Sequence, residues 1–167
     1  MRPPLEPRKT VRLQTQAGMS LTLNGIAQGY ITDRVTAFLR QSGYQNVLVH
    51  LGETYGAGHK SSGQPWRALI DGTEERIDLT DYALATSGSP AGSSITHLFD
   101  PGTARTASLY NTVSVTAPTA MLADGLSTAF HFLDTNQIQR VLSTYQRVSA
   151  VLVDRSGHIL KQLGVND

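Results

Sequence analysis

The chain has no cysteine among its 167 residues, which excludes disulfides, thiolate zinc sites and iron–sulfur clusters and leaves the redox compartment open. It has no apolar run approaching the roughly 20 residues of a membrane span. Charge is scarce and balanced: charged residues make up 16%, and 14 Lys and Arg face 13 Asp and Glu, a net charge of +1. Nucleic-acid-binding proteins typically carry a basic excess. We therefore expect no nucleic-acid partner and no membrane span.

The composition and length of the chain indicate one folded domain. Apolar residues make up 40% of the chain, which argues against disorder, and this length can bury a core without covalent or metal staples. Residues 1–9 contain three prolines and three basic residues and are predicted to be a flexible tail. This start has no hydrophobic signal-peptide core. Residues 10–167 are predicted to form a single domain.

Hydrophobic periodicity predicts more strands than helices. Helices are predicted over residues 26–41, 118–133 and 136–145, the second opened by Pro118 and the third capped by Asp134. Strands are predicted over residues 10–14, 19–23, 46–51, 66–71, 76–79, 82–86, 95–99, 111–116, 148–154 and 158–162, the first two as a hairpin. Short turns join them. The pattern is typical of an α+β fold with a largely antiparallel sheet and packed helices.

In the first predicted helix, the large apolar residues fall on one face at helical spacing: Tyr30, Ile31, Val35, Phe38 and Leu39. A glycine- and serine-rich stretch, residues 52–64, could cradle a phosphate, but its composition favours an exposed flexible loop.

The helix predicted after Pro118 carries the most informative polar group. Asp124, Ser127 and Thr128 share a face at spacings of three and four residues. A carboxylate beside two hydroxyls offers the hard oxygen ligands that Mg²⁺ prefers, with waters and substrate phosphates completing its shell. The alternative is an amphipathic helix whose polar residues face water. His131, seven residues after Asp124, is either a ligand or a buried, hydrogen-bonded histidine.

Two further segments offer chemistry. His97 and Asp100 lie at the end of a predicted strand, where they could act as general base and partner; the alternative is a turn-capping aspartate beside an edge-strand histidine. Gly25 lies where a strand enters a helix, so the backbone could approach a phosphate there. A tight turn explains this glycine equally well. The dinucleotide fingerprint and the P-loop lysine are both missing.

Six segments, in this order, resemble one known family, the FAD:protein FMN transferases (ApbE-like). They are LNGIAQGYITD at 23–33, VLVHLGE at 47–53, PW at 65–66, ATSGS at 85–89, HLFDPGTA at 97–104 and SVTAPTAMLADGLST at 114–128. Six ordered matches are far more specific than any one motif.

The resemblance implies a T-fold-like α+β domain and an enzymatic activity. Such enzymes take FAD as substrate and need Mg²⁺. They transfer FMN to a threonine hydroxyl of a target flavoprotein and release AMP. Family members are usually periplasmic or inner-membrane lipoproteins of about twice this length. The chain therefore looks like the C-terminal half, which could be inactive alone.

The resemblance also implies site residues, which are carried over by matching positions. The implied metal ligands are Asp124, Ser127, Thr128 and the backbone carbonyl of Gly25. The implied FAD-contacting residues are Thr22, Asn24, Gln28 and Phe99, and the implied catalytic pair is His97, as proton acceptor, with Asp100.

This chain departs from the family pattern at several of these motifs. Asn24 replaces a glycine, Gln28 replaces a frequent lysine, and Glu53-Thr54 stands where Gly-Asp is usual. Two other functions therefore stay open. One is a non-catalytic flavin- or nucleotide-binding module, or a truncated subunit that needs a partner chain. The other is a structural domain that assembles with another subunit.

Overall fold

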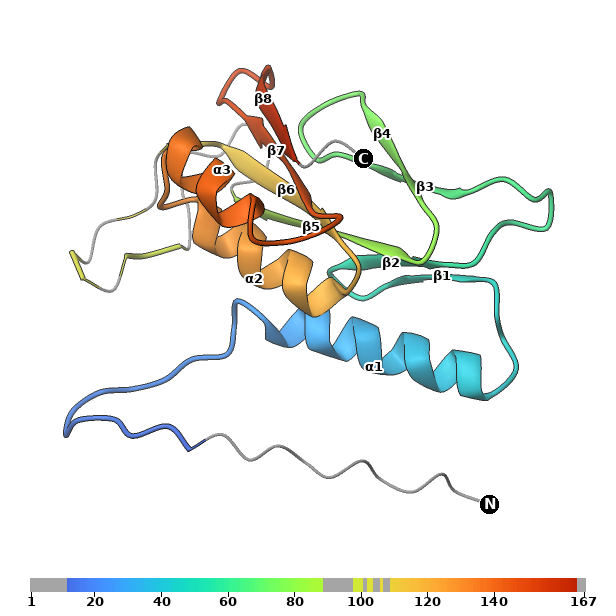
Figure 1. Cartoon of the computed structure of the whole chain (residues 1–167), viewed down its shortest axis with the longest axis horizontal. Coiled ribbons are helices and arrows are strands. Elements are labelled where there is room, and N and C mark those ends of the chain that lie inside the picture. The colour runs from blue at the N-terminus through green and yellow to red at the C-terminus, as the bar shows by residue number, and fades with distance from the viewer. Residues whose placement is uncertain (1–11, 89–97, 101, 104–105, 107–108, 165–167) are drawn as a thin grey trace.

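The computed structural model describes residues 12–88, 98–100, 102–103, 106 and 109–164 (Figure 1). The predicted tail, residues 1–9, lies outside this part of the chain. The elements follow one another as α1 (Ala27–Gln41), β1 (Val47–His50), β2 (Thr54–Ala57), β3 (Trp66–Leu69), β4 (Arg76–Leu79), β5 (Tyr82–Gly88), β6 (Thr112–Ala117), α2 (Ala120–Phe130), α3 (Thr135–Leu142), β7 (Ser149–Val153) and β8 (Ile159–Gly164).

The main sheet has six strands in the order β1-β2-β5-β6-β7-β8, and every neighbouring pair is antiparallel. Strands β3 and β4 form a separate antiparallel hairpin. The predicted α+β class with a largely antiparallel sheet is confirmed.

Strand β6 shows how the sequence divides the two faces of the sheet. Its six residues, TVSVTA, are all buried, and successive side chains point to opposite faces. Val113 and Val115 join the core cluster that includes the apolar residues of α2. On the other face, Ser114 Oγ lies 2.8 Å from Thr86 Oγ1, so the buried hydroxyls satisfy one another across strands.

The helices α1 and α2 cover one face of the sheet, with α2 against β5 and β6 and α1 alongside α2 (Figure 1). The two helices cross in backbone contact at Gly29. A Cβ built on Gly29 would lie 2.4 Å from the carbonyl oxygen of Ala120, so only glycine permits this approach. The crossing brings the first turn of α1 beside the first turn of α2, within hydrogen-bond distance of the Asp124 carboxylate.

The N-terminus of α2 is capped twice. Thr119 is its N-cap and accepts a hydrogen bond from Leu122 N. The carboxylate of Asp33, on α1, accepts hydrogen bonds from Ala120 N at 2.8 Å and Met121 N at 2.9 Å. A negative charge at this end also complements the helix dipole. The prediction that Pro118 occupies the first helical position is wrong, because the helix begins after the Thr119 cap.

One predicted hairpin is absent from the described residues, and one strand, β2, was not predicted. Residues 12–23 form no strand, so the predicted hairpin is wrong: their alternation finds no partner strand in the described part of the chain. The stretch predicted to be an exposed loop contains β2, with Tyr55, Gly56 and Ala57 buried. Gly56 serves close packing here, because its Cβ would lie 2.7 Å from that of Leu79. The predicted strand over residues 95–99 lies mostly outside the described residues.

The large apolar residues of α1 share a face, as predicted, but several of them point to solvent. Tyr30 is 52% exposed, Ile31 51% and Phe38 65%. The buried positions of α1 are instead Gly29, Thr32 and Thr36. An apolar groove of about 330 Å³ runs along this surface, lined by Leu23, Ile26, Ala27, Tyr30, Ile31 and Met121. None of the helices in the described part of the chain is long and apolar enough to cross a membrane.

Candidate functional site

A pocket of about 430 Å³ lies where the start of α1, the end of β5 and α2 meet. We call it the Asp124 pocket. Most of the residues implied by the resemblance line it, although they come from three separate segments: Thr22, Asn24, Gly25, Gln28, Phe99, Asp124 and Thr128. The fold thus brings residues of three separate sequence motifs together in one pocket.

Asp124 is only 4% exposed, and α1 positions its carboxylate. Its Oδ2 accepts a hydrogen bond of 2.9 Å from the backbone N–H of Gly29, at the helix crossing. Burial raises the pKa of Asp124 above its ordinary value, and the hydrogen bond from Gly29 offsets part of that rise. A buried carboxylate that is held in place but costly to ionise is suited to a cation.

The two hydroxyls on α2 have different surroundings. Thr128 lines the pocket, whereas Ser127 is fully buried and is not among the lining residues. Ser127 Oγ donates to the carbonyl oxygen of Asp124 at 2.9 Å. Ser87 Oγ, on β5, lies 2.7 Å from Ser127 Oγ and 3.1 Å from Thr128 Oγ1. Ser87 therefore links β5 to the two hydroxyls of α2 by hydrogen bonds. Sequence reasoning gave it no role, because no local spacing links it to α2.

Gly25 lies against α2 as the resemblance implies. A Cβ built on it would lie 3.3 Å from Thr128 Cγ2 and 3.5 Å from Thr128 Oγ1. Its carbonyl oxygen is 3.9 Å from the position of a Cβ on Gly125. The backbone carbonyl of Gly25 is thus close to the same turn of α2 that carries Asp124 and Thr128.

A second acidic residue, Glu53, lines the pocket and has no role in the sequence-based assignment. It is 6% exposed. Burial, with a smaller effect from the charge of Asp124, raises the pKa of Glu53 to about 7; a hydrogen bond from the backbone N–H of Thr86 acts in the opposite direction. Its neighbour Gly52 has φ +100°, and a Cβ there would lie 2.9 Å from Gln28 Nε2. The only sequence signal for Glu53 is a charged residue at the end of an alternating apolar stretch.

The segment around Asp100 is only partly described. Phe99 lines the pocket and is 61% exposed. Asp100 accepts hydrogen bonds from Thr103 Oγ1 at 2.8 Å and Gly102 N at 2.9 Å, and these bonds lower its pKa. This is the geometry of the turn-capping alternative. His97 lies outside the described residues, so the catalytic pair stays a prediction.

His131 matches the alternative of a buried, hydrogen-bonded histidine. It is fully buried, and its Nε2 lies 2.8 Å from the carbonyl oxygen of Ser87. Within the described ranges, no three His, Asp or Glu side chains gather closely enough to hold a metal ion. A cation in the Asp124 pocket would therefore need hydroxyl, carbonyl or water oxygens as well as carboxylates.

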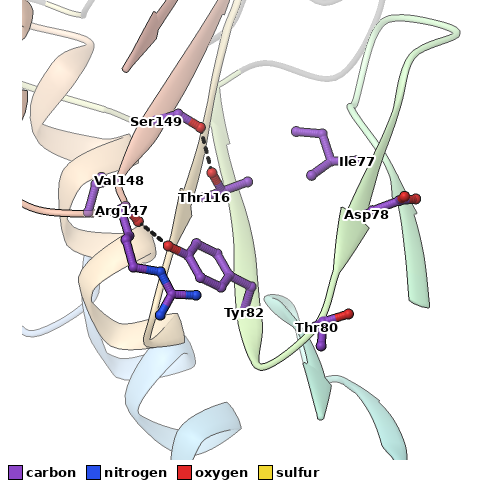
Figure 2. A pocket seen from close by; sticks show the side chains of 8 residues that line it. All are labelled: Ile77, Asp78, Thr80, Tyr82, Thr116, Arg147, Val148 and Ser149. Carbon is purple, nitrogen blue, oxygen red and sulfur yellow. Dashed lines mark hydrogen bonds between the residues drawn. The ribbon is translucent and has the colours of Figure 1, made fainter. Parts of the chain in front are cut away.

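A second cavity, of about 340 Å³, lies on the opposite face of the sheet from α2 (Figure 2). There the guanidinium of Arg147 stacks over the ring of Tyr82, 4.7 Å from its centroid, and Tyr82 Oη donates to the carbonyl oxygen of Arg147 at 2.6 Å. Thr116 and Ser149 share a 2.6 Å hydroxyl contact beside them (Figure 2). This cavity contains none of the residues predicted for the site.

The Asp124 pocket thus combines a buried carboxylate with hydroxyl and carbonyl oxygens, the kinds of donor that hard cations accept. The chain belongs to the ApbE family, whose model matches residues 4–152. The predicted family membership is thereby confirmed.

Relatives agree in both sequence and structure. The FAD:protein FMN transferase of Salmonella typhimurium is 33% identical over 136 residues, which cover 72% of this chain and 39% of that protein. The FAD:protein FMN transferase of Klebsiella pneumoniae is 29% identical, over 83% of this chain and 44% of that protein. The flavin transferase ApbE from Vibrio cholerae superposes with a TM-score of 0.72 at 28% identity, over 84% of this chain and 48% of that one. The ApbE protein of Thermotoga maritima superposes with a TM-score of 0.74 at 26% identity, over 87% of this chain and 52% of that one.

The chain spans 39% to 50% of the length of the curated relatives it matches. The stretch that the family model matches, residues 4–152, includes the residues that line the Asp124 pocket. The activity of the whole relatives is therefore carried to this chain as a proposal below.

Proposed function

We propose that this chain carries the cation- and FAD-binding site of an FAD:protein FMN transferase. The reaction moves FMN from FAD to a threonine hydroxyl of a target flavoprotein, forming a phosphoester bond and releasing AMP. The observation that carries the proposal is the Asp124 pocket, in which family-matched residues from separate segments meet around a buried carboxylate.

The donor set fits Mg²⁺. Asp124 would supply the carboxylate, Thr128 a hydroxyl and Gly25 a backbone carbonyl, and Ser127 stays a predicted ligand behind them. In the described part of the chain Asp124 forms no salt bridge, so its negative charge is available to a cation. When bound, Mg²⁺ would neutralise charge on the pyrophosphate oxygens and so favour departure of AMP.

The other pocket residues would hold FAD. Thr22, Asn24 and Gln28 line the pocket with polar groups that carry no full charge. The exposed ring of Phe99 offers a face on which a flat heterocycle can stack. We propose His97 as the group that accepts the proton of the threonine hydroxyl at an imidazole nitrogen, with Asp100 as its partner.

An in vitro transfer assay tests this function. The chain is incubated with FAD, Mg²⁺ and a flavoprotein domain that carries an acceptor threonine, and covalent flavin and AMP are measured. Asp124→Asn should reduce transfer by at least a hundredfold. Glu74→Gln, an exposed carboxylate outside the pocket, should leave it unchanged. Full activity of the Asp124 variant would refute the assignment of the site.

A second function, a non-catalytic flavin- or nucleotide-binding module or a subunit that needs a partner chain, is favoured by one observation. Tyr30, Ile31 and Phe38 expose apolar surface on α1. Titration calorimetry separates the two functions. FAD binding that does not depend on Mg²⁺, without release of AMP, would support the module.

A further inference from the structure

Glu53 occupies a position that the fold specifies closely. β1 and β2 form a hairpin in which His50 pairs with Thr54, which leaves a three-residue loop of Leu51, Gly52 and Glu53. The backbone N–H of Leu51 donates to the carbonyl oxygen of Glu53 at 3.0 Å, and Gly52 takes the left-handed conformation that closes the turn. The turn thus directs a buried glutamate into the Asp124 pocket rather than into solvent.

The pocket consequently contains two buried carboxylates. Gly29 N–H donates to Asp124 Oδ2 at 2.9 Å, and the backbone amide of Thr86 favours the charged form of Glu53, which lowers its pKa against the effect of burial. Neither carboxylate takes part in a salt bridge among the residues that the structure describes. Two like charges buried together without a counter-charge are destabilising. A divalent cation between them would remove that penalty.

We propose that Glu53 is a second carboxylate ligand of the cation in the Asp124 pocket. The inference rests on the proposed function, because it concerns the same site. Two carboxylates match the charge of a divalent ion, and the hydroxyl of Thr128 and the carbonyl of Gly25 add neutral oxygens of the kind that Mg²⁺ and Mn²⁺ accept. Such a site takes up its cation before the nucleotide arrives, whereas a site with one carboxylate relies on nucleotide phosphates for the remaining charge.

The test is a titration of the full chain with Mn²⁺ alone, without FAD, by calorimetry and by the loss of the free Mn²⁺ signal in electron paramagnetic resonance. Wild-type protein should bind one Mn²⁺. Glu53→Gln keeps the size of the side chain and an acceptor for Thr86 N–H but removes the charge, so the Kd should rise at least tenfold. Asp124→Asn should weaken binding at least as much, and the exposed control Glu74→Gln should not change it.

Two measurements separate loss of a ligand from loss of structure. Metal-free Glu53→Gln should unfold at the same temperature as wild type or higher, because a buried charge has been removed. Glu53→Asp, which keeps the carboxylate on a shorter side chain, should recover part of the affinity. Wild-type affinity in Glu53→Gln, or no Mn²⁺ binding by the wild-type chain without nucleotide, would overturn the inference.

The outcomes distinguish this inference from the proposed function. If both carboxylate variants lose Mn²⁺ but no FMN transfer is found, the inference stands and the transferase proposal fails. If Asp124→Asn alone loses the cation and abolishes transfer, the transferase proposal stands and the role of Glu53 is refuted.

Discussion

Replacing Gly29 by alanine tests how the site is built. In an ordinary helix this change stabilises by up to about 1 kcal/mol. Here the new Cβ would lie 2.4 Å from the oxygen and 2.6 Å from the carbonyl carbon of Ala120, and 2.7 Å from Met121 Cα. All three are backbone atoms, so the helices must separate. Overpacking of this kind costs about 1–3 kcal/mol.

Separation also stretches the hydrogen bond from Gly29 N to Asp124 Oδ2, and weakening a buried bond to a carboxylate costs about 1–3 kcal/mol more. After subtraction of the helix-propensity gain of about 1 kcal/mol, we expect a net loss of about 1–5 kcal/mol. For a chain of this size that corresponds to a fall in Tm of roughly 2–20 °C.

Thermal and urea unfolding followed by circular dichroism measure this loss. The matched control is Gly125→Ala, the other glycine within a described helix, whose Cβ would lie 3.2 Å from the movable Cγ2 of Ile26; its stability should stay within about 1 kcal/mol of wild type. A Gly29→Ala protein as stable as its Gly125→Ala counterpart would show that the helices do not touch as described.

Three smaller perturbations follow from the same structure. Asp33→Ala removes both carboxylate bonds to the start of α2 and should cost about 2 kcal/mol in urea unfolding, against less than about 0.5 for its exposed neighbour Arg34→Ala; equal effects would contradict the cap. Asp134→Ala removes a capping box on α3 and should lower stability by about 1 kcal/mol, with no change in Mn²⁺ affinity. In metal-free protein, the pKa of Glu53 is raised from 4.5 to about 7 in the folded state, so the folded state binds more protons between these values. Stability should therefore fall as pH rises from about 5 to 7, by at most about 3 kcal/mol; Glu53→Gln should remove this dependence, and an unchanged profile would contradict it.

Most of the fold was predictable because local signals and tertiary packing agree. β6 follows its alternating sequence, and Asp134 caps α3 as its position indicates. β2 was missed because Gly56 and Gly58 read as loop residues. In the fold, Gly56 is buried against Leu79 and Trp66, a contact between segments that no local pattern reveals.

The candidate site was predictable where its residues share one helix. Asp124 and Thr128 lie one turn apart on α2, so their spacing in the sequence made them candidates. Glu53 lies in the loop between β1 and β2, and Ser87 lies on β5. Both line the Asp124 pocket only because of the order in which the strands pair. Neither has a spacing relationship to α2, and their proximity to Asp124 depends on how the strands pair.

The uncovered apolar surface of α1 has a consequence for access to the site. Leu23 and Ile26 belong to that groove, and between them in the chain lie Asn24 and Gly25, which line the Asp124 pocket. The same short stretch of chain thus lines both the apolar groove and the Asp124 pocket. A polypeptide that packs into the groove would therefore contact residues directly adjacent in sequence to two residues of the Asp124 pocket.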